Sequence, residues 1–207
     1  MMSADLLLAL VAFAFISSIT PGPNNLMLMA SGTNFGLRRT LPHMFGVSLG
    51  FTLMVALVGI GIARIFETVP YAYLTLKTVS AVYLLYLAWK IARAAPPQDK
   101  SVAADGRPFT FLQAAAFQWV NPKAWAMALT AVSAYTTASA PIASLAVVVF
   151  VFWLINLPSI SIWTVLGTQV RRFLGNPVRL RIFNVTAALL LVATLWPILS
   201  STGVAHP

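Results

Sequence analysis

The stretch of sequence that decides the fold is residues 4–31, ADLLLALVAFAFISSITPGPNNLMLMAS. Its first apolar run ends before Pro21 and is too short to cross a bilayer, whose core of about 30 Å needs roughly 20 helical residues. Apolar residues resume only after Pro21-Gly22-Pro23. Each proline removes an amide donor and clashes with the preceding turn, and the glycine adds flexibility. We therefore expect a transmembrane helix that is broken inside the membrane.

Five further segments are apolar and long enough to span a membrane. With the broken first helix they give six expected spans, at residues 4–31, 40–63, 70–92, 109–134, 141–169 and 182–199. The composition agrees, because 59% of the 207 residues are hydrophobic and only 8% are charged, whereas a soluble domain has about 25% charged residues. We expect an all-α polytopic membrane protein, with one transmembrane domain over residues 1–207.

The composition also excludes several functions. The chain has no cysteine, so disulfides, thiolate metal sites and cysteine nucleophiles are absent. Its two histidines, His43 and His206, are far apart in the sequence and suggest no metal site. The net charge of +9 does not indicate a nucleic-acid partner, because the basic residues lie between apolar runs. We expect neither an enzyme nor a bound cofactor or metal, and no catalytic residue is identified.

The basic residues predict the orientation in the membrane. Three alternate connections hold ten of the thirteen Lys and Arg residues, which are Arg38, Arg39, Lys90, Arg93, Lys100, Arg107, Arg171, Arg172, Arg179 and Arg181. The other connections hold only Arg64. Because cytoplasmic loops carry the excess of Lys and Arg, we expect the first, third and fifth loops in the cytoplasm and both termini outside.

A polar linker at residues 94–108, AAPPQDKSVAADGRP, divides the chain into a first half, 1–93, and a second half, 109–207. We expect this linker to be cytoplasmic. Three spans in each half force the halves into opposite orientations, as in inverted-repeat transporters. The fourth expected helix carries a second break at Asn121-Pro122-Lys123. We therefore predict two inverted three-helix repeats with broken first and fourth helices.

Polar residues follow both breaks. At 1.5 Å per residue the breaks lie roughly 14 and 18 Å from the cytoplasmic side, so their depths are similar. A half-helix that begins inside the membrane offers free amide donors and a positive dipole end to an anion. A lysine at that depth costs about 2.5–3.5 kcal/mol and usually marks a pathway or a site. We interpret four residues as substrate-binding, namely Asn24, Asn25, Asn121 and Lys123, with Lys123 pairing with a substrate carboxylate.

We interpret the breaks themselves as hinges, formed by Pro21, Gly22, Pro23 and Pro122. The alternative is structural: neighbouring helices satisfy the freed carbonyls of a kink, and Lys123 donates to carbonyls freed by Pro122.

Other residues in the spans carry weaker signals. Lys77 is a further candidate for substrate binding, although its long side chain could also reach the headgroups. Asn156 and Pro158 are expected to interrupt the fifth helix, and Asn156 and Trp153 are candidates for lining a pocket. No carboxylate lies deep in any expected span, so a lysine would carry the proton if export is coupled to protons.

The second expected helix carries Gly46-x-x-x-Gly50, which permits close helix contact. The contact could lie within the bundle or in a homodimer, and the sequence does not separate these two arrangements.

Three stretches carry a resemblance to a known family, namely TPGPNNLMLMASGTNFGLRRTLPHMFGVSLGF at 20–51, LKTVSAVYLLYLAWKIARA at 76–94 and FQWVNPKAWAMALTAVSAY at 117–135. In this order they resemble the LysE/RhtB family of bacterial amino-acid exporters, and the PGPNN and YLAWKIA motifs are similar to its cysteine and O-acetylserine branch. The resemblance implies a six-helix bundle in the bacterial inner membrane that exports amino acids or close derivatives by proton antiport. Many members have an acidic residue after PGP, where this chain has Asn24.

We therefore expect a secondary transporter that exports amino acids by alternating access, with an amino acid, the lipid bilayer and protons as its partners. The alternative is a membrane channel or an exporter of another small metabolite. A membrane-embedded enzyme would need a nucleophile, a metal cluster or paired acids in the spans, and the sequence offers none.

Overall fold

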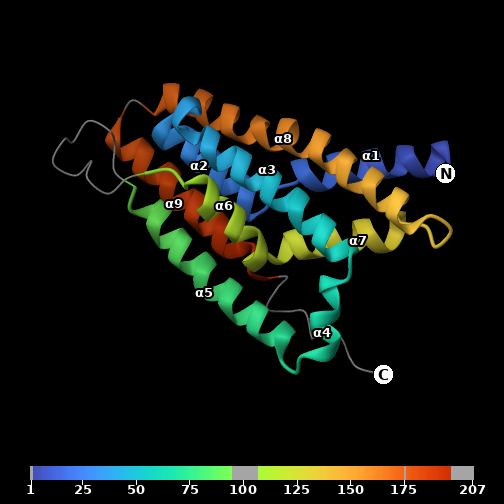
Figure 1. The fold of residues 1–207 in the computed structure, drawn as a ribbon. Coiled ribbons are helices and arrows are strands. Elements are labelled where there is room, and N and C mark those ends of the chain that lie inside the picture. The colour runs from blue at the N-terminus through green and yellow to red at the C-terminus, as the bar shows by residue number, and fades with distance from the viewer. Residues whose placement is uncertain (1, 95–106, 175, 197–207) are drawn as a thin grey trace.

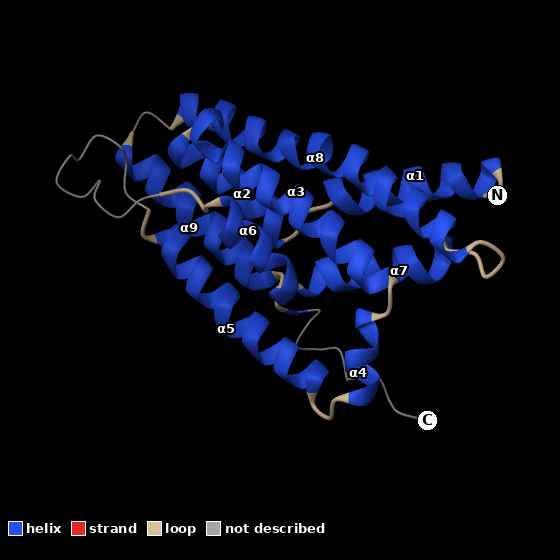
Figure 2. Ribbon diagram, in the orientation of Figure 1, coloured by secondary structure: helices blue, strands red, loops and turns tan. Residues whose placement is uncertain are grey.

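The computed structural model describes residues 2–94, 107–174 and 176–196, and these residues form helices and connecting turns without a strand (Figure 2). The helices are α1 (Ala4–Ile19), α2 (Pro23–Phe35), α3 (Leu37–Gly59), η1 (Ile62–Arg64), α4 (Ile65–Thr68), α5 (Ala72–Ala92), α6 (Phe111–Phe117), η2 (Gln118–Val120), α7 (Pro122–Tyr135), α8 (Pro141–Phe173) and α9 (Pro177–Ala193). Most of the expected linker, the end of the sixth expected span, Lys100 and His206 lie outside the described residues.

Both predicted helix breaks are present. The axes of α1 and α2 meet at an angle of 53° on either side of the break at residues 20–22. The second break separates α6 and the 3-10 turn η2 from α7, with Asn121 in extended conformation between them. The expected all-helical fold with broken first and fourth segments is therefore confirmed for the described residues.

Proline explains where several helices begin. The first helical residue is a proline in α2, α7, α8 and α9, namely Pro23, Pro122, Pro141 and Pro177. Proline suits this position because its fixed φ matches the helix and its missing N–H would have no intrahelical partner there. Pro158 behaves differently, since α8 continues without a break through it. The expected interruption of the fifth helix at Asn156 and Pro158 is therefore wrong.

Glycines allow the backbones of α2 and α8 to touch. A Cβ atom on Gly32 would lie 2.3 Å from the carbonyl oxygen of Thr164, and one on Gly167 would lie 2.1 Å from that of Met29. Thr33 also donates from its hydroxyl to the carbonyl of Gly167 at 3.0 Å. Small residues serve this purpose in membrane helices, where close packing rather than exclusion of water holds the helices together.

The predicted glycine motif is used inside the bundle. A Cβ atom on Gly46 would lie 2.4 Å from the carbonyl oxygen of Phe111, and one on Gly50 would lie 2.6 Å from the Cα of Ala115. Both contacts are with α6, so this face of α3 packs against another part of the same chain. Of the two arrangements that the sequence left open, contact within the bundle is the one observed at these glycines.

The helix contacts follow a regular pattern. α1 packs on α8 as α6 packs on α3, α2 packs on α8 as α7 packs on α3, and α5 pairs with α9 (Figure 1). These contacts, which are among the most extensive in the bundle, map onto one another or onto themselves when α1, α2, α3 and α5 are exchanged for α6, α7, α8 and α9.

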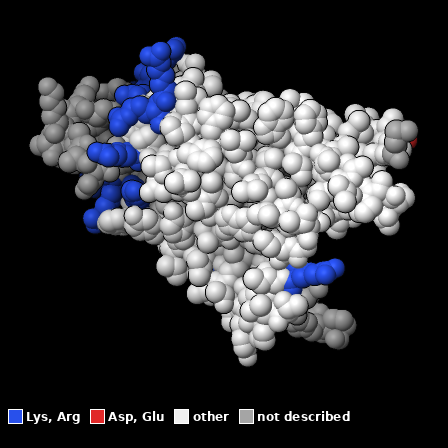
Figure 3. All heavy atoms as spheres, in the orientation of Figure 1, with Lys and Arg blue, Asp and Glu red and all other residues white. Residues whose placement is uncertain are grey.

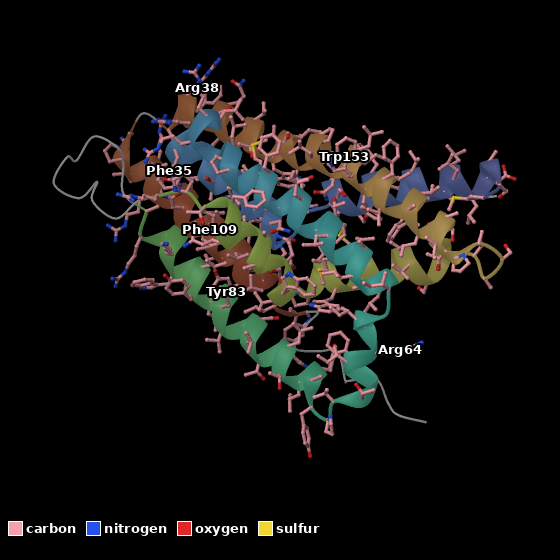
Figure 4. The ribbon with its side chains drawn as sticks, viewed as in Figure 1. Phe35, Arg38, Arg64, Tyr83, Phe109 and Trp153 are labelled. Carbon is pink, nitrogen blue, oxygen red and sulfur yellow. The ribbon has the colours of Figure 1, made fainter. Side chains whose placement is uncertain are left out.

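Three helices, α3, α5 and α8, are long and apolar enough to cross a membrane, and the bent pair α1–α2 makes a fourth candidate. The helices α7 and α9 have 14 and 17 residues and are shorter than a usual span. Figure 3 shows Lys and Arg gathered at the end of the bundle away from the N-terminus, and Figure 4 shows Arg38 and Arg64 at opposite ends. The charge asymmetry expected from the sequence is therefore visible among the described residues.

Candidate functional site

A small cavity lies where the α1–α2 break meets α3, α7 and α8. The volume that the centre of a water molecule can reach in it is about 30 Å³. That space is enough for a few waters, since a single water needs about 10–15 Å³ by this measure. The polar residues that line it are Ser17, Ser18, Asn24, Asn25, Asn121, Lys123 and Asn156. The cavity thus brings together all four residues that the sequence assigned to substrate binding near the breaks.

The carbonyl oxygens at the end of α1 receive side-chain donors. Proline residues at the break remove the amides that would otherwise bind these oxygens. Asn25 donates through Nδ2 to the carbonyls of Ser18 at 2.9 Å and Thr20 at 2.8 Å. Trp163 donates through Nε1 to the carbonyl of Ile19 at 2.9 Å. The break is thus stabilised by side chains, as buried backbone groups in a membrane require.

Lys123 reaches the same break from the other half of the chain. Its Nζ donates to the carbonyl oxygen of Thr20 at 2.6 Å and to that of Pro21 at 3.4 Å. This position at the C-terminal end of α1 favours a positive charge, because the helix dipole is negative there. The structural alternative for Lys123 placed it on carbonyls freed by Pro122, whereas the carbonyls that it contacts belong to the first break.

Gly22 is required at this contact because a side chain there would not fit beside Lys123, and not because of its backbone conformation. Its φ of −175° is extended and open to any residue. A Cβ atom there would lie 2.7 Å from Cδ and 3.1 Å from Nζ of Lys123. Gly22 therefore lets the lysine side chain cross the break, which is a different reason for a glycine from the flexibility that the sequence suggested.

A reciprocal pair of amide hydrogen bonds joins the two breaks. Asn24 donates through Nδ2 to Oε1 of Gln118 at 2.8 Å, and Gln118 donates through Nε2 to Oδ1 of Asn24 at 3.2 Å. Gln118 is fully buried and also donates to the carbonyl of Ala114 at 2.8 Å. Gln118 was not among the residues predicted to bind substrate, although a glutamine three residues before Asn121 in an apolar segment is a usable signal.

Asn121 and Asn156 have different surroundings in the cavity. Asn121 is the N-cap of α7, and its Oδ1 accepts from the backbone N–H of Lys123 at 3.1 Å. Asn156, on α8, donates through Nδ2 to the hydroxyl of Ser18 at 3.1 Å. Its Oδ1 has no hydrogen-bond partner in the part of the chain that the structure describes.

Three other polar or aromatic residues lie away from the cavity. Lys77 is half-buried on α5 and is not among the residues that line it. Trp153 is 49% exposed on the outer side of α8 (Figure 4) and packs against Phe150, with ring centroids 5.8 Å apart. It therefore does not line the pocket. His43 is buried beside Phe109, with ring centroids 5.2 Å apart, and neither of its nitrogens has a partner among the described residues.

The charges of the cavity favour an anionic group. Lys123 is the one charged side chain among the described lining residues, which include neither Asp nor Glu. The amide groups at the start of α2 lie beside it, at the positive end of the helix dipole. The large apolar side chains that line the cavity are Val47, Phe51, Met127 and Ile160. Among the described residues no cluster of three or more His, Asp or Glu side chains could hold a metal ion.

Comparisons with known proteins give a consistent result. The model of the LysE type translocator family matches residues 15–194. The chain is 36% identical over 135 residues to the cysteine/O-acetylserine efflux protein of Escherichia coli strain K12, an alignment that covers 65% of this chain and 67% of that protein. The proteins of the same name from Shigella sonnei strain Ss046, at 36%, and Escherichia coli O1:K1 / APEC, at 35%, match with the same coverage. No solved structure gives a significant match.

Proposed function

This chain belongs to the LysE type translocator family, and we propose that it exports amino acids or close derivatives from the cytoplasm across the bacterial inner membrane. The observation that carries the proposal is the cavity at which two broken helices meet and which Lys123 shares with four asparagines. Transporters of known architecture bind their substrates near the bilayer midplane between discontinuous helices. The relatives named as cysteine/O-acetylserine efflux proteins support a small amino acid as substrate.

Lys123 binds the substrate carboxylate in this proposal. In this structure the ammonium group of Lys123 donates hydrogen bonds to the carbonyl oxygens of Thr20 and Pro21. Binding moves the ammonium from these neutral oxygens to the carboxylate, because a charged acceptor forms the stronger hydrogen bond. Asn24 and Asn25 then orient the carboxylate at the start of α2.

Transport requires a conformational step. The cavity must open to each side of the membrane in turn, so the helices around the breaks must move. The hinges for this motion are Pro21, Gly22, Pro23 and Pro122. Access then alternates between the two sides of the membrane as the halves of the chain move against each other.

The proposed membrane arrangement is six spans in two inverted repeats, with both termini outside. The regular pattern of helix contacts supports it, because a two-fold exchange of the halves reproduces every major contact. The gathering of Lys and Arg at one end supports a cytoplasmic position for that end (Figure 3).

Proton antiport completes the proposal. Lys123 is the one titratable side chain among the described residues that line the cavity. A lysine that exchanges its proton between the two sides could couple export to the proton gradient. Lys77 lies outside the cavity, so we leave it out of this site.

The test is an efflux assay with the full-length protein in proteoliposomes loaded with a panel of amino acids, including cysteine and O-acetylserine. We expect saturable efflux of one or a few of them, lost when a protonophore collapses the proton gradient. Efflux of none, from protein shown to be folded in the liposomes, would contradict the proposal. A flux that does not saturate and ignores the proton gradient would indicate a channel instead.

A further inference from the structure

Asn156 carries a buried acceptor that the bundle does not use. Its side chain lies on α8, is only 4% exposed and lines the cavity. The Nδ2 group donates to Ser18, whereas Oδ1 has no partner in the described parts of the chain. Native proteins pair most buried polar atoms, because an unpaired one loses its hydrogen bonds to water without replacement. An unpaired acceptor on a side chain that lines a cavity is therefore a candidate for contact with a ligand.

Two of the three other asparagines that line this cavity have an amide oxygen with a partner inside the protein. Oδ1 of Asn24 accepts from Gln118 at 3.2 Å, and Oδ1 of Asn121 accepts from the backbone of Lys123 at 3.1 Å. Both oxygens are thus occupied by contacts within the protein. The oxygen of Asn156 has no such contact among the described residues, so it can accept a hydrogen bond from a donor on the substrate.

We propose that Oδ1 of Asn156 accepts a hydrogen bond from the α-ammonium group of the substrate, and that this contact makes the site selective for α-amino acids over carboxylic acids that lack the amino group. The inference rests on the proposed function, since it concerns the second end of the same substrate. An amino acid is a zwitterion, and a cavity that binds only its carboxylate could not distinguish it from a simple acid.

A neutral acceptor at position 156 leaves Lys123 available to the substrate. The zwitterionic substrate adds no net charge, so the charged partner of its carboxylate in the cavity is Lys123. A carboxylate side chain at position 156 would form an ion pair with Lys123 and compete with the substrate, because buried opposite charges attract strongly. An amide oxygen accepts from the ammonium without adding a charge.

Thr164 provides a matched control on the same helix. Its Oγ1 is also buried and has no hydrogen-bond partner among the described residues. It packs against Gly32 of α2 and is not among the residues that line the cavity. Thr164→Val thus removes a second unpaired polar atom from α8 while leaving the proposed contact intact.

The experiment compares efflux of L-cysteine and 3-mercaptopropionate from proteoliposomes under reducing conditions. The two compounds share the carboxylate, the thiol and the carbon chain, and they differ only in the amino group. The wild-type protein and the variants Asn156→Leu, Asn156→Asp and Thr164→Val are compared at equal amounts of folded protein. We expect the wild type to export cysteine about tenfold faster or more, because a site built to bind an N–H group discriminates against its absence.

The three variants distinguish the loss of the hydrogen-bond acceptor from a change in helix packing. Asn156→Leu should bring the two rates within about twofold of each other, mainly by slowing cysteine, since it removes the acceptor. Asn156→Asp loses the donor to Ser18 but keeps an acceptor, so it should retain the preference for cysteine even if its overall rate falls. Thr164→Val should behave as the wild type.

Three results would overturn the inference while leaving the proposed function in place. They are a retained preference in Asn156→Leu, a lost preference in Asn156→Asp, and an equal loss in Thr164→Val. If Asn156→Leu does not fold, Asn156→Ala takes its place, because it also removes the acceptor. A wild-type protein that moves neither compound would instead contradict the proposed function for this substrate, and the inference with it.

Discussion

The ammonium group of Lys123 donates to the carbonyl oxygen of Thr20 at 2.6 Å, so a lysine from the second broken helix occupies a carbonyl freed by the first. This contact joins residues 103 positions apart in the sequence. It gives the lysine a partner in the absence of substrate and keeps its charge at the cavity. The same side chain is thus both a structural ligand of the break and the candidate ligand of the substrate.

Replacing Lys123 should separate these two roles. Lys123→Met should reduce efflux by about 10- to 100-fold, because a hydrogen bond to a charged group contributes about 1.5–3 kcal/mol. The loss of stability should be modest, since Thr20 keeps its bond from Asn25. Efflux measured in proteoliposomes checks the first effect, and thermal unfolding in detergent checks the second.

Lys77→Met is the matched control for that experiment. It removes another helical lysine, at a position outside the cavity. We expect this variant to retain efflux, and an equal loss in both variants would contradict the assignment of the site to the cavity.

Gly22→Ala should act through Lys123. The added methyl would lie 2.7 Å from Cδ of that lysine, so the side chain must leave its place on the break. We expect efflux to fall about tenfold in the wild-type background and to change less than about twofold in Lys123→Met, because two changes that remove the same contact are not additive. A double-mutant cycle on efflux rates measures this coupling, and additive effects would contradict it.

The pair Asn24 and Gln118 should show a coupling in stability. Asn24→Leu leaves the buried amide of Gln118 without this partner, and Gln118→Leu does the same to the half-buried amide of Asn24, at a cost of about 1–3 kcal/mol. The double change removes both amides and should destabilise less than the sum of the single changes. Thermal unfolding of the four proteins in detergent tests this, and a double variant that equals the sum would argue against the pair.

Gly167→Ala should destabilise the bundle. Its Cβ would lie 2.1 Å from the carbonyl of Met29, and backbone cannot move aside as a flexible side chain can. We expect a loss of about 1–3 kcal/mol, the usual cost of overpacking. An unchanged unfolding temperature would show that α2 and α8 separate more easily than their contact suggests.

His43→Leu should leave both efflux and stability intact or raise the stability. The ring is buried without a partner for either nitrogen among the described residues, so an apolar side chain removes two unsatisfied groups. Unfolding temperature and efflux are measured together. A loss of efflux with normal stability would assign the histidine a role beyond packing.

The helix breaks were predictable because proline and glycine act locally. Pro21, Gly22 and Pro23 stand together and Pro122 follows a polar residue, so the sequence alone located both breaks, whereas the isolated Pro158 left α8 continuous. The partner of Lys123 was not predictable, because it depends on how α7 crosses the end of α1. The space needed at Gly22 depends on the same crossing.

The least predictable feature was which side of each helix faces the core of the bundle and which side faces lipid. In a water-soluble helix, polar residues mark the outer face, whereas in a membrane both the lipid-facing side and the core side are apolar. The sequence of α8 therefore did not show that Asn156 faces the cavity while Trp153, three residues earlier, faces away from it. For the same reason the sequence did not show that α2 and α8 make contact at Gly32 and Gly167.

The carbonyls at the end of α1 also bear on how the protein is made. The side-chain donors for Ile19 and Pro21 are Trp163 and Lys123, which the ribosome adds more than a hundred residues later. An unpaired carbonyl in lipid is costly, so the nascent first half cannot settle into the bilayer core as a finished unit. Insertion must hold it in a wetter environment until α7 and α8 arrive. The two halves of the chain therefore reach their final structure together. A chain that ends after α5 should be degraded by quality-control proteases.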